Sequence, residues 1–451
     1  MKSHSEVLIQ PFFKGEKGLP LDFEGELEEL LFLYPKGKRV LAVGLGERKS
    51  VTDDGLRRAY AVAARACQSK KITAAKVIVP KDISVQPCAE GIYLGNYAYT
   101  ALKNSTLKEN PVTLLKKIVF VSKDSSAIKK AKILADGVHF VRDLVNTNSD
   151  DKPPSYLVSI AKSLGEKYSN IAVEVLDKKR IEKEKMGLIL AVSQGSPRDP
   201  ALILLNYVGD PSSKECIALV GKGITFDTGG LNIKTAGMET MKMDMAGGAV
   251  ILGTLQTAAA LNLKKNILGV IPAVENSIGP MSYKPGDVYT SYLGQTVEVT
   301  NTDAEGRLIL ADALAYTVKN YSPTTIIDMG TLTGAIVVAL GEEIAGLFCN
   351  NEFLGQKLQE ASKKCGERIW PMPLPMDYKK LLQSDIGDIK NSAGKIASSI
   401  QCALFLQEFV GTTPWAHLDI AGVDCHQKAT GYHPANASGV GVRLFIQFLE
   451  L

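Results

Sequence analysis

The sequence predicts an α/β protein with two consecutive α/β domains, and three observations support this. The chain has 451 residues, which is too many for a single hydrophobic core. Apolar runs typical of strands alternate with segments whose apolar residues recur at helical spacing. Turn-forming residues and two prolines interrupt this alternation at residues 146–154. We therefore expect a smaller N-terminal domain of βαβ type and a larger domain with a mixed central sheet flanked by helices.

The composition is ordinary for a globular enzyme. Hydrophobic residues make up 45% of the chain and charged residues 22%, and the net charge of +4 is too small to favour nucleic acid or an anionic membrane as partner. The seven cysteines are scattered without a Cys-x-x-Cys pair, which favours reduced thiols over disulfides or a thiolate zinc site. No signal-type core follows the first residues, and no apolar run reaches membrane-spanning length. We expect a cytoplasmic protein with no membrane partner.

The first domain is predicted to span residues 1–125. Apolar spacing predicts strands and helices in alternation, with strands at 7–13, 39–43, 75–79 and 117–121 and helices at 52–67 and 88–102. Thr52 is predicted to cap the first helix, because Asp53 and Asp54 would occupy its first turn. Gly44-Leu45-Gly46 lacks the third glycine of a dinucleotide-binding loop, so a turn at a strand end is the favoured interpretation.

Residues 126–154 are predicted to link the domains, as a long helix over 126–145 followed by the proline-containing break. The larger domain, residues 155–451, is predicted to be catalytic. Its strand-type runs lie at 201–208, 216–220, 267–274, 325–329 and 415–420, with helices between them. A charge run at 177–185 is typical of the solvated face of a helix.

The octapeptide at residues 301–308 (Asn-Thr-Asp-Ala-Glu-Gly-Arg-Leu) joins a strand-type run at 296–300 to an apolar helical pattern, a junction that commonly carries catalytic groups. Asp303 and Glu305 are two residues apart, so in an extended backbone both carboxylates face one side and need a proton or a cation between them. Gly306 is expected to allow a sharp turn, and Arg307 adds a permanent positive charge. The alternative is an acidic loop that caps a helix, with Arg307 as its salt-bridge partner.

Two upstream segments add further polar groups at similar places. Lys222 and Asp227 follow a buried-type strand among glycines, and Gly223 after the lysine argues against a Walker phosphate loop. Asp244 precedes an apolar helical run, where it could also serve only as a cap.

Four carboxylates therefore lie where a strand ends or a helix begins: Asp227, Asp244, Asp303 and Glu305. Oxygen-rich sites for two divalent metals are built in this way, and such sites suit hydrolysis of an amide or a phosphoester. The chain contains neither an HExxH nor a GxSxG motif, which excludes a thermolysin-type metalloprotease and a nucleophile elbow.

The octapeptide resembles the signature of the leucyl aminopeptidase (cytosol aminopeptidase) family. Further motifs similar to that family lie at residues 221–230, 241–248, 275–276, 284–288, 331–334 and 415–422. The resemblance covers essentially all of residues 140–451, whereas the first 130 residues match only in general pattern. It implies a metal-dependent aminopeptidase that removes N-terminal residues, bulky apolar ones above all, from short peptides. Family members are usually hexamers of two stacked trimers whose active sites face an interior cavity.

The resemblance also implies a role for each site residue, with Zn²⁺ or Mn²⁺ as the expected cations. One metal would be held by Lys222, Asp227, Asp244 and Glu305, and the second by Asp227, Asp303 and Glu305. Lys234 would stabilise the oxyanion of the tetrahedral intermediate, and Arg307 would hold a bicarbonate ion that acts as general base. The pocket for the first side chain of the substrate would be lined by Met241, Asn301, Ala304, Thr331 and Gly334.

Two segments depart from the common family pattern. The loop from Lys234 to Asp244 is one residue shorter, and residues 391–399 replace the usual glycine-rich start of a helix. Two other functions stay open. An architectural DNA-binding role could accompany the peptidase, although the weak net charge and the lack of a basic stripe argue against it. A two-metal phosphoesterase uses similar carboxylates, but the placement of lysine and arginine matches the peptidase.

Overall fold

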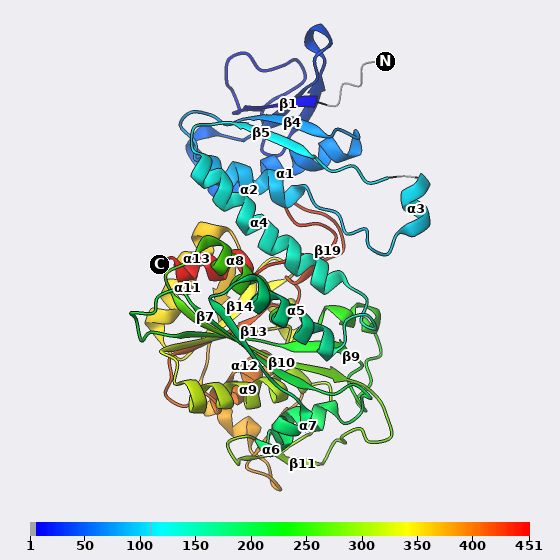
Figure 1. The fold of residues 1–451 in the computed structure, drawn as a ribbon, viewed down its shortest axis with the longest axis vertical. Coiled ribbons are helices and arrows are strands. Elements are labelled where there is room, and N and C mark those ends of the chain that lie inside the picture. The colour runs from blue at the N-terminus through cyan, green and yellow to red at the C-terminus, as the bar shows by residue number, and fades with distance from the viewer. Residues whose placement is uncertain (1–5, 110) are drawn as a thin grey trace. The chain divides into compact units, whose positions relative to one another are not determined.

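The computed structural model describes residues 6–109 and 111–451, and Figure 1 labels its elements. The chain forms two compact units. The first contains the chain up to Arg142 together with residues 364–366 and 426–438, and the second contains residues 143–363, 367–425 and 439–451. All predicted site residues belong to the second unit. Within the described ranges, no helix is both long enough and apolar enough to cross a membrane. The boundaries expected at residues 125 and 154 stay predictions.

The first unit is built on a five-stranded sheet with the order β2-β3-β1-β4-β5, in which only β2 and β3 pair antiparallel. Its strands are β1 (Glu6–Phe12), β2 (Leu30–Leu33), β3 (Val40–Gly44), β4 (Ala74–Ile78) and β5 (Lys117–Val121). Its helices are α1 (Asp53–Ser69), α2 (Val85–Gly95) and α3 (Asn104–Glu109), and α4 (Ser125–Asn146) continues into the second unit. Thr52 caps α1 as predicted, because its hydroxyl accepts the N–H of Gly55 at 3.1 Å.

Two elements of this unit differ from the prediction. The sequence did not indicate β2, an edge strand of four half-buried residues that is too short for a clear alternation of burial. The helix expected at residues 88–102 ends at Gly95, because Asn96 turns the chain toward another segment. The Asn96 amide donates to the carbonyl of Leu115 at 3.0 Å and accepts the N–H of Leu115 at 2.8 Å.

The second unit is built on a mixed nine-stranded sheet, as the sequence predicts. The strand order is β15-β14-β17-β13-β8-β10-β7-β6, and β9 pairs with β10. Strands β17, β13, β8 and β10 run parallel to one another. Strand β14 is antiparallel to β17 but parallel to β15, and β7 is antiparallel to both of its neighbours, β10 and β6. The strands are β6 (Ile171–Leu176), β7 (Ala201–Val208), β8 (Ile217–Gly221), β9 (Gly223–Asp227), β10 (Asn266–Asn276), β13 (Thr325–Gly330), β14 (Ala345–Cys349), β15 (Ile369–Pro371) and β17 (Trp415–Asp419). Shorter strands form two small sheets, one of β11 (Val288–Thr290), β12 (Thr296–Glu298) and β16 (Ile389–Lys390) and one of β18 (Cys425–His426) and β19 (Asn436–Ala437).

Helices cover both faces of this sheet, with α8 and α13 on one side and α9 and α12 on the other (Figure 1). The helices are α5 (Pro154–Lys167), α6 (Lys178–Lys183), α7 (Gly187–Ser193), α8 (Ala246–Leu261), α9 (Glu305–Tyr321), α10 (Gly334–Leu340), α11 (Glu352–Cys365), α12 (Ser398–Gln407) and α13 (Val442–Leu449). Both α8 and α9 are buried around nearly their whole circumference over their first three turns. The carboxyl ends of β8, β9 and β13 therefore meet the starts of two firmly held helices, which is where α/β proteins place their ligands.

Asp312 fixes the position of α9. Its carboxylate is fully buried and accepts the backbone N–H groups of Leu188 at 2.9 Å, Ile189 at 3.1 Å and Tyr292 at 2.8 Å. Buried N–H groups need partners, so this one side chain satisfies the start of α7 and the turn after β11 while holding α9 against both.

We expect Asp312→Ala to lower the free energy of unfolding by about 3 kcal/mol or more, because it strands three buried N–H groups. Urea denaturation monitored by circular dichroism measures the change. The control is Lys319→Ala on the exposed side of the same helix, which should stay within about 0.5 kcal/mol of the unmodified protein. A loss for Asp312→Ala no larger than that of the control would contradict the role assigned to this carboxylate.

Candidate metal centre

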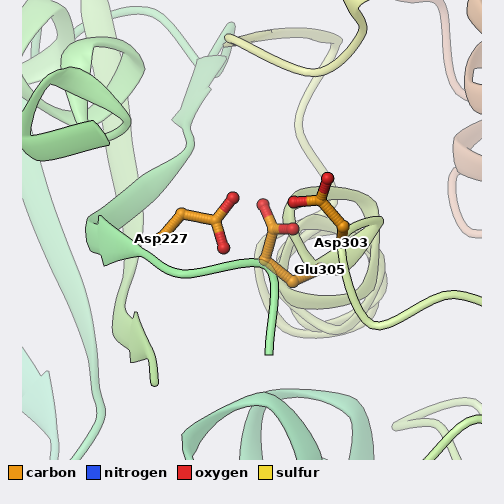
Figure 2. Close-up of side chains that lie close together, drawn as sticks. All are labelled: Asp227, Asp303 and Glu305. Atoms are coloured by element: carbon orange, nitrogen blue, oxygen red, sulfur yellow. The ribbon is translucent and has the colours of Figure 1, made fainter. Parts of the chain in front are cut away.

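Three carboxylates converge at the edge of the nine-stranded sheet. Figure 2 shows that Asp227, Asp303 and Glu305 point their carboxylates toward one another, and one oxygen of each lies within 4.8 Å of the others. Asp227 ends β9, Glu305 begins α9, and Asp303 lies in the loop directly before α9. Two elements that lie 78 residues apart in the chain, counted from Asp227 to Glu305, thus supply one cluster.

Lys222 and Asp244 extend this cluster. The Nζ atom of Lys222 lies 2.8 Å from Asp244 Oδ1 and 2.9 Å from Glu305 Oε1, and it donates to the carbonyl of Thr331 at 2.8 Å. Lys222 lies between β8 and β9, and Asp244 lies between the 3-10 segment Met238–Met243 and α8. The Thr331 hydroxyl also donates to Asp244 Oδ1 at 2.6 Å, so the end of β13 holds both groups.

Gly306 serves a different purpose from the sharp turn that the sequence suggested. It lies within the first turn of α9, and it is not among the glycines of positive φ. A Cβ atom at this position would lie 2.5 Å from Cε of Lys222 and 2.8 Å from its Nζ. Glycine is therefore required here because the lysine side chain passes directly over the helix backbone.

Lys234 and Arg307, the two predicted catalytic residues, border the cluster in different ways. Lys234 contacts two carboxylates directly, with Nζ 2.7 Å from Asp227 Oδ2 and 2.5 Å from Asp303 Oδ1. Arg307 is buried in the first turn of α9 and donates from Nη1 to the carbonyl of Asn391 at 2.8 Å.

The carboxylates are buried and repel one another. Burial, together with the charges of Glu305 and Asp244, raises the pKa of Asp227 well above its usual range. Burial also raises the pKa of Asp244 to about 6, although Lys222 opposes the shift. For Lys222, burial lowers the pKa, but the carboxylates of Asp244, Glu305 and Asp227 outweigh it and raise the pKa above that of an ordinary lysine.

Two carboxylate oxygens of the cluster lack the partner that a bound cation would provide. Asp244 Oδ2 and Glu305 Oε2 are buried and have no hydrogen-bond partner among the described residues. A buried carboxylate oxygen without a partner is unfavourable unless a positive charge lies against it. Four carboxylates and one amine, arranged in this way, match the donor set of divalent cations.

The sequence analysis assigned no role to two asparagines that hold the cluster in place, although both lie in segments that it named. Asn276, the last residue of β10, donates to Asp227 Oδ1 at 2.7 Å. Its position at the end of an apolar strand could have indicated a site residue, as it did for the carboxylates. Asn391 accepts the N–H of Thr300 at 2.9 Å and donates to the carbonyl of Asn301 at 2.7 Å. The strand expected at residues 296–300 ends at Glu298, because the backbone N–H of Thr300 bonds the Asn391 side chain and not a neighbouring strand. No local signal near residue 300 could have indicated Asn391 as its partner.

The residues expected to line the substrate pocket lie on several elements of the second unit, and their role stays a prediction. Asn301 borders a cavity of about 410 Å³, and its Oδ1 accepts the N–H of Asp303 at 2.9 Å. The other residues of this cavity are Asn232, Thr300, Lys390, Ser392, Ala393 and Gly394. Ala304 is buried beside α9, Met241 lies in the 3-10 segment, and Gly334 begins α10.

Comparison with known proteins identifies relatives over the whole chain. The sequence profile of the cytosol aminopeptidase family, catalytic domain, matches residues 139–446, and that of the N-terminal domain matches residues 20–106. The probable cytosol aminopeptidase of Protochlamydia amoebophila is 46% identical over 481 aligned residues, which cover 100% of this chain and 96% of the relative. That of Chlamydia trachomatis serovar D is 43% identical, with 100% and 97% covered.

A solved structure matches the fold equally well. The bottromycin maturation enzyme BotP, solved in complex with Mn, superimposes with a TM-score of 0.92 at 28% identity, covering 99% of both chains. Fold, sequence profiles and full-length relatives agree with one another. This chain therefore belongs to the cytosol aminopeptidase family and is a peptide hydrolase.

Proposed function

We propose that this chain is a two-metal aminopeptidase that removes bulky apolar N-terminal residues from short peptides. The observation that supports it most strongly is the cluster of Asp227, Asp303 and Glu305, which Lys222 joins to Asp244. Two carboxylate oxygens of this group, on Asp244 and Glu305, lack a partner among the described residues. The first metal would be held by Lys222, Asp227, Asp244 and Glu305. The second would be held by Asp227, Asp303 and Glu305, with Zn²⁺ or Mn²⁺ as the cations; the Mn bound by BotP favours the latter.

Two divalent cations held by these residues would supply an activated water and a polarised scissile carbonyl. Hydrolysis would add the water to the carbonyl carbon, break the C–N bond and return a proton to the leaving amine. Lys234, whose Nζ contacts Asp227 and Asp303, would donate to the oxyanion that develops. The planar guanidinium of Arg307 suits a bicarbonate ion, which would accept the proton of the water.

The cavity beside Asn301 supports the assignment of substrate preference to the segment after β16. Ser392, Ala393 and Gly394 line its far wall, in the stretch that departs from the common family pattern. The side chain of the first substrate residue would be lined by Met241, Asn301, Ala304, Thr331 and Gly334, of which Asn301 also borders this cavity. A cytoplasmic location and a hexamer of two stacked trimers remain what the family resemblance leads us to expect.

We expect Asp227→Ala and Glu305→Ala to lose activity by orders of magnitude, because each removes a ligand shared by both cations. Lys234→Ala is the matched contrast. It should keep two metal ions per chain while turnover falls by about a hundredfold, the usual effect of losing one oxyanion contact. Metal analysis and hydrolysis of leucine p-nitroanilide measure both quantities. Two bound ions in either carboxylate variant, or loss of metal in Lys234→Ala, would show that the roles proposed for these residues are wrong.

Lys222 makes the metal affinity depend on pH. An ammonium has no lone pair to donate, so a cation at this position must displace a proton that the surrounding carboxylates hold firmly. Protons therefore compete with the metal as pH falls, and occupancy and activity should rise toward alkaline pH. Lys222→Arg should empty the position at every pH, because a guanidinium stays protonated.

Metal content of purified Lys222→Arg, measured from about pH 6 to about pH 9, tests this prediction. The unmodified chain should gain metal as pH rises, whereas the variant should hold one ion per chain at most. A lysine that served only as a salt-bridge partner of Asp244 and Glu305 would tolerate arginine. Full occupancy of the variant throughout this range would therefore show that Lys222 is not a ligand.

A further inference from the structure

A second buried lysine lies close to the proposed metal centre, in the proline-containing break that the sequence analysis treated as a linker. The side chain of Lys152 is fully buried. Its Nζ donates to three backbone carbonyls, those of Leu144 at 3.0 Å, Val145 at 3.0 Å and Lys242 at 2.9 Å. An ammonium carries three N–H donors, so these three carbonyls satisfy it completely.

Two of these carbonyls belong to the end of α4. The last four carbonyls of a helix have no partner within the helix, and Leu144 and Val145 lie within three residues of its end at Asn146. A cation at a helix C-terminus also interacts favourably with the helix dipole. Lys152 therefore binds the C-terminal carbonyls of α4, which belong to the second unit.

The third carbonyl connects this point to the segment that carries Asp244. Lys242 lies two residues before Asp244, and Met245, whose Sδ is 3.4 Å from the Lys152 ammonium, follows it directly. The Lys152 head group thus contacts the chain on both sides of a proposed metal ligand.

The segment before Asp244 is exposed over much of its length, although Met243 is buried and Lys222 and Thr331 bond the Asp244 side chain. Residues 235, 236, 239 and 240 are exposed, and Gly237, at the start of the 3-10 turn, has a φ of 73°. Exposed segments with few buried contacts open locally at low free energy. The backbone position of Asp244 consequently depends on contacts from outside its own segment.

We propose that Lys152 is a positioning residue for the metal centre. Its ammonium bonds the end of α4 to the backbone carbonyl of Lys242, just before Asp244, contacts the side chain of Met245, just after it, and thereby sets the place of that ligand. The inference rests on the proposed function, because it assigns Asp244 to a metal. Burial lowers the pKa of Lys152 to about 7.

A matched control exists in α4, the helix whose end Lys152 contacts. Arg142 is also a fully buried cation, and it donates to the carbonyls of Leu94, Tyr432 and Ser438, all in the first unit. Lys152→Met and Arg142→Met each remove a buried cation from three carbonyls. The two variants should lose similar stability, but only Lys152→Met should change the metal site.

We expect the Mn²⁺ affinity of Lys152→Met to fall by about tenfold or more, as is usual when a group that orients a ligand is removed. In metal-free protein, backbone amides of residues 238–245 should exchange hydrogen faster. Arg142→Met should match the unmodified protein in both measurements. Lys152→Gln, which keeps two N–H donors, replaces the methionine variant if that variant does not fold. Unchanged affinity and unchanged exchange in the Lys152 variant would overturn the inference.

Chemical rescue adds a second test. In Lys152→Ala, ammonium chloride should restore Mn²⁺ affinity and slow the exchange of residues 238–245, whereas tetramethylammonium chloride at the same ionic strength should not, because it has no N–H donor. Equal effects of the two salts would contradict the proposal. If the unmodified chain bound no divalent cation, the proposed function would fail, and hydrogen exchange would still decide whether Lys152 holds this segment.

Discussion

The contact between Lys222 and the carboxylates of Asp244 and Glu305 is the interaction on which the site depends. The lysine follows β8, and its Nζ lies 2.8 Å from Asp244 Oδ1, in the segment before α8, and 2.9 Å from Glu305 Oε1, at the start of α9. The lysine reaches them only because Gly306 and Gly330 leave room, since a Cβ on either would lie within 2.8 Å of its side chain. Burial makes this contact strong and also makes an unbalanced charge unfavourable, so a cluster of this kind needs protons or cations to balance its carboxylates.

The rest of the second unit keeps these groups in place. Asp312 holds α9 from its middle, and Asn276 orients Asp227 from the end of β10. Lys152 reaches the Asp244 segment from the end of α4. These contacts are between polar groups deep in the protein, where each partner is needed to satisfy the other. The geometry of the cluster is therefore a property of the whole sheet and its two buried helices.

Much of this organisation could be read from the sequence. The alternation of apolar runs with helical patterns predicted both large sheets. Strand β5 alternates in burial, β7 is a continuous apolar run, and the sequence of α4 has helical apolar spacing. The carboxylates could be found because each stands where an apolar run stops, and parallel strands bring such points to one edge. Contacts that join distant segments gave no local signal. Asn391 and Lys152 act on groups about 90 residues away, and β2 is too short to show a period.

Anomalous diffraction from crystals grown with Mn²⁺ tests the central claim most directly, because it locates each ion without reference to activity. The account predicts two peaks per chain that share Asp227 and Glu305, with the Nζ of Lys222 bound to one of them and Lys234 bound to neither. A single peak, or two peaks with Lys222 turned away and paired only with carboxylates, would contradict a two-metal centre that uses a lysine as ligand.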